Sequence, residues 1–201
     1  MTVLIDYGAG NIRSVENALH FLSEDSLLTS DPDAVLRADH IILPGVGAFG
    51  DAMEKIRAAG LEEVIREAVN RNIPFLGICL GLQLLFEESD ESPGVKGLGI
   101  LKGTVKRIPE GEGRKVPQIG WNDLSYPNPG RLFQDIPEHS YVYFVHSYYL
   151  EARDPEIVTA RTRYGVEIDA SVEKGNVFAC QFHPEKSADV GMAVLRNFLK
   201  V

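Results

Sequence analysis

The first ninety residues alternate short apolar runs with longer stretches in which apolar side chains recur every three or four positions. Strands are predicted at residues 3–5, 26–29, 41–43 and 73–78, and helices around residues 15–22 and 61–69. The run at 73–78 contains no charge, so we expect it in the middle of a parallel sheet, buried on both faces. This pattern predicts an α/β fold with a mostly parallel central sheet flanked by helices.

The second half has a different pattern. From about residue 98, strand-like runs are separated by turn sequences such as EGEG, YPNPG and EKGN, which predicts an antiparallel β extension. A closing helix is predicted over residues 189–201, with Val190, Val194 and Phe198 along one side. Residues 110–117 (EGEGRKVP) are expected to form a mobile loop. No linker separates the halves, so we expect a single domain over residues 1–201.

Composition narrows the class of protein. The chain has 201 residues, a formal net charge of −9 and 44% hydrophobic residues, which is typical of a globular protein. The acidic balance argues against nucleic acid as a partner, and no run approaches the roughly 20 apolar residues of a membrane helix. The N-terminus lacks the features of a secretory signal, so we expect a cytoplasmic location and two free thiols, with no membrane partner.

The sequence PFLGICLGLQLLF carries the strongest chemical signal. It predicts a strand, a turn and a helix, with Cys79 in the turn between Gly77 and Gly81. A nucleophile in such a tight turn needs small neighbours, and glycine supplies that space. The N-terminus of the following helix favours thiolate over thiol, and the N–H of Leu80 is placed to receive an oxyanion. A buried, inert thiol is the alternative for Cys79, and the two glycines weaken it.

A nucleophilic cysteine needs a base and a group that orients the base. His183 and Glu185 end a predicted strand, and parallel strands deliver their carboxyl ends to one edge of the sheet. His183 can therefore meet Cys79 if their strands are neighbours. Cys180, in mid-strand without flanking glycines, is expected in the core.

The remaining histidines receive structural interpretations. His20, His40 and His139 lie at polar positions, in turns or at element ends. For His146, within YFVHSYY, a buried and hydrogen-bonded structural role is favoured over a catalytic one.

A glycine-rich turn, GVGAFG, follows the predicted third strand and matches the dinucleotide-binding pattern. The match fails in context, because the acidic residue expected about 20 positions later would fall in a helix. We therefore interpret the N–H of Val46 as a second oxyanion donor. Gly45 would let the Gly45–Val46 peptide rotate at low cost. The turn at residues 8–11 is expected to connect a strand and a helix near the same edge.

Together these residues resemble the class I (triad) glutamine amidotransferases. The resemblance is carried by PGVGAFGDAM, GICLGLQLLFEES and FHPEKS, in that order. IDYGAGNIRSVENAL, SPGVKGLG, GWN and YFVHSYY look most like one branch, the glutaminase subunit of imidazole glycerol phosphate synthase, so the resemblance covers essentially the whole chain. It implies a flavodoxin-like fold and an enzyme that hydrolyses glutamine, with no cofactor and no metal.

The resemblance also assigns roles to residues. It makes Cys79 the nucleophile, His183 the general base and acid, and Glu185 the orienting carboxylate. It places the following residues around the substrate or the oxyanion: Gly45, Val46, Gly47, Leu80, Gln83, Glu91 and Ser147. One position departs from the branch, which commonly has histidine where this chain has Gln118, in a segment expected to face the partner.

The resemblance implies a heterodimer with a (β/α)₈-barrel cyclase subunit, which uses the released ammonia in histidine biosynthesis, so that the complex acts as a lyase. Three alternatives stay open. The chain could serve another ammonia-using synthase, such as the one that makes pyridoxal phosphate. It could be a catalytically silent binding protein on the same fold, against which the intact Cys79, His183 and Glu185 count. It could also be a cysteine peptidase, although Gln83 and Glu91 suit a small zwitterion better.

Overall fold

The structure is a computed structural model and describes residues 1–8, 12–111 and 114–201. Residues 9–11 of the predicted turn at 8–11, and residues 112–113 of the loop predicted at 110–117, lie outside the described residues. The described elements, including short 3₁₀ helices labelled η, are β1 (Thr2–Ile5), α1 (Ile12–Phe21), β2 (Ser26–Thr29), α2 (Pro32–Val35), β3 (His40–Gly45), α3 (Phe49–Ala58), α4 (Leu61–Asn70), β4 (Phe75–Cys79), α5 (Leu80–Leu84), β5 (Glu88–Ser89), β6 (Gly103–Arg107), β7 (Gln118–Asp123), η1 (Arg131–Phe133), β8 (Tyr141–His146), β9 (Tyr148–Ala152), η2 (Pro155–Ile157), β10 (Val158–Tyr164), β11 (Val166–Lys174), β12 (Val177–Cys180), η3 (Pro184–Lys186) and α6 (Ala188–Phe198).

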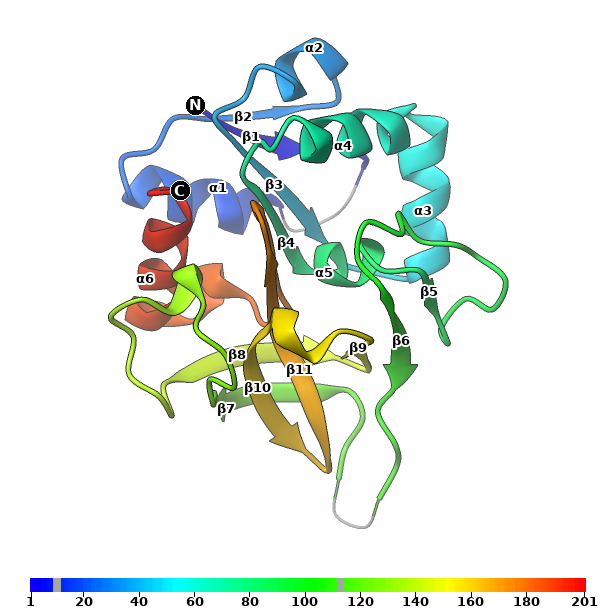
Figure 1. The fold of residues 1–201 in the computed structure, drawn as a ribbon, viewed down its shortest axis with the longest axis vertical. Coiled ribbons are helices and arrows are strands. Elements are labelled where there is room, and N and C mark those ends of the chain that lie inside the picture. The colour runs from blue at the N-terminus through cyan, green and yellow to red at the C-terminus, as the bar shows by residue number, and fades with distance from the viewer. Residues whose placement is uncertain (9–11, 112–113) are drawn as a thin grey trace.

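Seven strands form the central sheet, in the order β10-β11-β12-β4-β3-β1-β2. The strands from β12 to β2 run parallel, whereas β11 pairs antiparallel with β12 and β10 pairs antiparallel with β11. This arrangement confirms the predicted parallel sheet with an antiparallel extension in the second half. Two smaller sheets, β5-β6-β9 and β7-β8, lie at one end of the central sheet (Figure 1).

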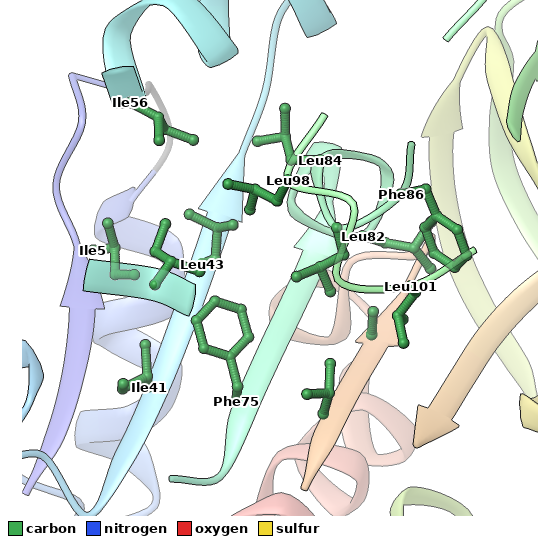
Figure 2. Packing of buried hydrophobic residues seen from close by; sticks show 14 of the residues in the cluster. Ile5, Ile41, Leu43, Ile56, Phe75, Leu82, Leu84, Phe86, Leu98 and Leu101 are labelled. Carbon is green, nitrogen blue, oxygen red and sulfur yellow. The ribbon is translucent and has the colours of Figure 1, made fainter. Parts of the chain in front are cut away.

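The central sheet is covered on both faces. Leu43 and Phe75 pack on the side of α3 and α4, whereas Ile42 and Leu76 pack on the side of α1 and α6. Figure 2 shows the first of these clusters, and Figure 1 shows the helix pairs on opposite sides of the sheet. Every residue of β4 is buried, as predicted for a charge-free strand in mid-sheet. Each fully buried large apolar side chain contributes roughly 1.5–3 kcal/mol, which allows the sheet to hold a strained turn at its edge.

The boundaries of two predicted elements differ from the structure. β4 begins at Phe75 rather than at residue 73, because Pro74 has no N–H to donate to a neighbouring strand. The last helix, α6, covers Ala188–Phe198 rather than 189–201, with its final residues beyond the regular helix. The carboxyl ends of β3, β4 and β12 lie side by side at one edge of the sheet, since Gly45 pairs with Cys79 and Ile78 pairs with Cys180.

Candidate active site

Cys79 occupies the strained turn between β4 and α5. Its backbone angles, φ 55° and ψ −106°, lie in a region that residues other than glycine rarely adopt. Such a conformation costs of order 1–3 kcal/mol and persists only where the surroundings fix it. Leu80, the next residue, begins α5, so its N–H has no acceptor within the helix.

The glycines on either side of Cys79 are required by close backbone contacts. A Cβ on Gly77 would lie 2.7 Å from the carbonyl oxygen of Gly81. A Cβ on Gly81 would lie 1.9 Å from the carbonyl oxygen of Leu43 on β3. From the sequence we expected a Cβ at either glycine to collide with the turn itself. The structure shows such a contact at Gly77, whereas at Gly81 the contact is with the neighbouring strand β3.

His183 and Glu185 form a buried pair beside Cys79. His183 follows β12, the strand next to β4, and its Nδ1 donates to Glu185 Oε1 at 2.8 Å. The two side chains are only 4% and 1% exposed. Burial alone lowers the pKa of His183, but hydrogen bonds and charges from Cys79 and Glu185 outweigh it and raise this pKa to about 10. The imidazole is therefore oriented by a carboxylate on one side and hydrogen-bonded to a thiol or thiolate on the other.

A cavity of about 290 Å³ opens over this group. Small-molecule pockets typically begin near roughly 300 Å³, so the space suits a small ligand. The cavity is lined by Val46, Gly47, Cys79, Leu80, Gln83, Glu91, Pro117, Val145, His146, Ser147, Tyr148, His183 and Lys186. Eight sequence-predicted site residues are thus brought to one cavity. Gly45 and Glu185 are not among them and instead border a second cavity, of about 10 Å³, behind the histidine.

The side-chain amide of Gln83 is held in one orientation. Its Nε2 donates to the Tyr148 carbonyl at 3.0 Å and to Gln181 Oε1 at 3.1 Å. Because a carbonyl can only accept, both N–H groups of Gln83 are committed. What Gln83 can offer to a ligand in the cavity is its oxygen, an acceptor.

Glu91 has a structural contact in addition to its place on the cavity. Its Oε2 accepts the Phe49 N–H at 2.7 Å, and Ser92 Oγ accepts the Gly50 N–H at 2.9 Å. Helix α3 starts at Phe49 after Ala48, which makes no side-chain cap bond. Residues 91 and 92 therefore cap α3 from a distant part of the chain, directly after the glycine-rich turn.

His146 is fixed by two polar contacts. Its Nδ1 donates to the Tyr148 carbonyl at 2.8 Å, and in the neutral ring its unprotonated Nε2 lies 2.9 Å from the side-chain amide of Gln118. Burial lowers the pKa of His146 to about 4, so the ring is neutral at physiological pH. The buried, hydrogen-bonded histidine expected from the sequence is confirmed, although the ring also lines the cavity. Gln118 is only 3% exposed, so its side chain points inward from a segment expected to face a partner.

The other residues with structural interpretations behave as expected where the structure tests them. Cys180 is completely buried, and burial raises the pKa of its thiol well above the ordinary value. His139 pairs with Asp123, and the ring of His40 packs edge-on against Phe198. These contacts give each of the three residues a role in packing or surface pairing.

Sequence reasoning did not select five of the residues that line the cavity: Pro117, Val145, His146, Tyr148 and Lys186. Two signals could have found three of them. Val145 and Tyr148 flank His146 and Ser147 in YFVHSYY, and Lys186 directly follows Glu185. Pro117 had no such signal, because it reaches the cavity through the pairing of β7 with β8.

Metal-binding clusters and membrane-spanning helices are both missing from the part of the chain that the structure describes. Its residues hold no group of three or more His, Cys, Asp or Glu side chains placed to bind a metal ion. Among the helices described, none has the length and apolarity required to cross a membrane.

Comparisons with known proteins agree with this geometry. The family model described as "Glutamine amidotransferase class-I" matches residues 3–201. A curated protein of Moorella thermoacetica, "Imidazole glycerol phosphate synthase subunit HisH", is 51% identical over 97% of this chain and 92% of its own length. A protein of the same name from Methanothermobacter thermautotrophicus is 51% identical over 100% of this chain and 98% of its own.

Solved structures show the same fold. A crystal structure described as a glutamine amidotransferase superposes with a TM-score of 0.76 at 24% identity, covering 98% of this chain and 97% of that one. A glutamine amidotransferase from Thermotoga maritima superposes with a TM-score of 0.67 at 16% identity, covering 99% of this chain and 82% of that one.

Proposed function

Because the chain belongs to the class-I glutamine amidotransferase family, we propose that it is the glutaminase subunit of an imidazole glycerol phosphate synthase. The observation that carries the proposal is the arrangement of Cys79, His183 and Glu185. A strained cysteine faces a histidine oriented by a buried carboxylate, at the edge of a cavity suited to one amino acid. The relatives at 51% identity connect this chemistry to histidine biosynthesis.

The first half-reaction removes the amide nitrogen of glutamine. The Cys79 thiolate attacks the side-chain carbonyl carbon, and a carbon–sulfur bond forms. The N–H groups of Val46 and Leu80 receive the oxyanion, and losing one such donor typically costs about 10²- to 10³-fold in rate. His183, protonated and held by Glu185, gives its proton to the departing nitrogen, so ammonia leaves as the carbon–nitrogen bond breaks.

The second half-reaction regenerates the thiolate. His183, now neutral, takes a proton from water while the oxygen attacks the γ-glutamyl thioester. The carbon–sulfur bond breaks, glutamate leaves, and His183 returns to its protonated form. The retained oxyanion donors serve both steps, because each passes through a tetrahedral intermediate.

Substrate recognition divides between two side chains on the cavity. The free oxygen of Gln83 is an acceptor for the amide NH₂ of glutamine, since both of its own N–H groups are committed. The carboxylate of Glu91 suits the α-ammonium group. Gly47 and Ser147 complete the site along the walls of the cavity.

Ammonia is the useful product and has to reach an acceptor before it is protonated in bulk water. The proposal therefore includes a heterodimer in which the partner is a (β/α)₈-barrel cyclase. It is supported by the β7-β8 sheet, where Ile119 and Trp121 are 63% and 53% exposed although both are large and apolar. A cytoplasmic location is part of the proposal, since both thiols are free as a reducing compartment favours.

The test is to co-express the chain with a candidate cyclase and to assay glutamine hydrolysis with and without the nucleotide substrate. Stimulation by that substrate is expected, and a partner-independent full rate would contradict the proposal. Cys79→Ala should abolish glutamine-dependent synthesis and leave ammonia-dependent synthesis by the partner intact. Cys180→Ala is the matched control, because this second thiol lies in the core, and an equal loss of activity from it would refute Cys79 as nucleophile.

A further inference from the structure

Gln181 directly follows β12, two residues before His183, and is not among the site residues proposed above. Its side chain is completely buried, and both the oxygen and the nitrogen of its amide have a partner. Oε1 accepts from Gln83 Nε2 at 3.1 Å, and Nε2 lies 3.8 Å from Cys79 Sγ. A buried polar side chain in contact with the sulfur is a candidate for acting on that sulfur.

The orientation of the Gln181 amide follows from a chain of contacts. The Tyr148 carbonyl can only accept, so it fixes the NH₂ group of Gln83 toward itself. The second N–H of Gln83 then requires an acceptor, which is the oxygen of Gln181. With its oxygen engaged, Gln181 turns its NH₂ group toward Cys79.

We propose that Gln181 is a further catalytic residue, an amide donor held in place by Gln83 and Tyr148 that stabilises the thiolate of Cys79. The inference rests on the proposed function in one respect, that Cys79 is the nucleophile. A hydrogen bond to a charged acceptor is stronger than one between neutral groups, and the buried setting strengthens it further. Loss of the donor should therefore disfavour the thiolate relative to the thiol.

The other groups around the sulfur stay constant between variants. The Val145 carbonyl lies 3.8 Å from Cys79 Sγ and accepts from the thiol form. Titratable groups near the sulfur or on the cavity are Tyr7, Glu91, His146, Tyr148, Cys180, His183, Glu185 and Lys186. Replacing Gln181 alone changes none of these residues, so a difference in the alkylation of Cys79 between the wild type and the variant is assigned to loss of the Gln181 amide.

The experiment measures alkylation of Cys79 by iodoacetamide in the full chain as a function of pH. Mass spectrometry of the peptide that contains Cys79 separates it from Cys180. In Gln181→Met, which keeps the side-chain length and removes the donor, the rate on the acidic side should fall about tenfold. The pH midpoint of alkylation should rise by about one unit, with the high-pH plateau unchanged.

Ser171→Ala is the matched control. Ser171 is also completely buried, on the strand next to β12, and also makes two hydrogen bonds, to Ala179 and Thr159. Its loss should leave the midpoint in place. A midpoint in folded Gln181→Met within about 0.3 units of the wild type would overturn the proposal, because a purely structural role for Gln181 predicts that result.

A second measurement needs no variant that could fail to fold. In the wild-type protein, the side-chain NH₂ protons of Gln181 should shift in the NMR spectrum through the same midpoint as alkylation. Protons that do not respond to ionisation or alkylation of Cys79 would overturn the inference. Neither measurement uses glutamine, so the two proposals can fail separately. If the chain did not hydrolyse glutamine but Gln181→Met still raised the midpoint of alkylation, the proposed function would be refuted and the interaction of Gln181 with Cys79 would stand.

Discussion

Replacing Gly81 by alanine tests whether the cysteine turn depends on close contact with β3. The new Cβ would lie 1.9 Å from the Leu43 carbonyl oxygen, whereas ordinary contact begins at 3.4 Å, so the backbones would have to separate by about 1.5 Å. Both atoms belong to rigid elements, since Gly81 lies in α5 and Leu43 in β3. Overpacking of this kind typically costs about 1–3 kcal/mol, and we expect the upper end of that range.

The same displacement should impair catalysis more than stability. Leu80 begins α5 and Val46 directly follows β3, and the new Cβ pushes these two elements apart, so the two proposed oxyanion donors would no longer converge. A misplacement of about 1 Å can cost about 10²-fold in rate. Glutamine hydrolysis in complex with the cyclase should therefore fall at least that far, chiefly through kcat.

The assay pairs urea unfolding with steady-state kinetics, and Gly175→Ala is the control. Gly175 has φ +59°, and a Cβ added there would have no atom within 4 Å, so the substitution introduces backbone strain without a clash. It should cost about 1–2 kcal/mol and leave kcat unchanged. If Gly81→Ala kept wild-type kcat and lost no more stability than this control, the reasoning from the β3 contact would be wrong.

Two further predictions follow from the contacts of the site. Ser92→Ala removes the cap on the Gly50 N–H and should lower the free energy of unfolding by about 1 kcal/mol with little change in KM. Glu91→Gln keeps an acceptor for the Phe49 N–H and should mainly raise KM for glutamine. Urea titration and steady-state kinetics separate the two. The pKa of His183 is raised to about 10, so its contribution to stability should be complete below about 6.5 and disappear as pH rises through about 10. Urea unfolding between about pH 6 and about pH 10.5 should show this decline in the wild type, and an unchanged decline in His183→Gln would contradict the assignment.

Local periodicity predicted most of the central sheet. The strand expected at residues 26–29 is present with those bounds, and the charge-free run became the central strand β4. The neighbouring placement of the strands that carry Cys79 and His183 also followed, because parallel strands share one edge. These features depend on the burial of one or two faces, which leaves a repeating signal in the sequence.

The long-range hydrogen bonds that position the site residues leave no repeating signal in the sequence. Gln83 and Gln181 are 98 residues apart, and Glu91 caps a helix 42 residues earlier in the chain. Each pair is set by how separate elements pack, and a single glutamine or glutamate has no periodic pattern that would reveal its partner. The inward orientation of Gln118 was hidden for the same reason, since it depends on pairing with His146 across β7 and β8.

Gly45 and Gly47, the glycines on either side of Val46, are required for different physical reasons. A Cβ on Gly45 would lie 2.5 Å from the Tyr7 hydroxyl and 3.0 Å from Leu80 Cβ, so close packing explains this glycine without any rotation of the following peptide. Gly47 has φ +102° and no atom within 4 Å of such a Cβ, so only backbone conformation requires it. Rotation of the Gly45–Val46 peptide therefore has no support from the presence of glycine at position 45. The glycine in this turn that is required for its conformational freedom is Gly47, and its φ angle bears on the Val46–Gly47 peptide rather than on the peptide that carries the Val46 N–H.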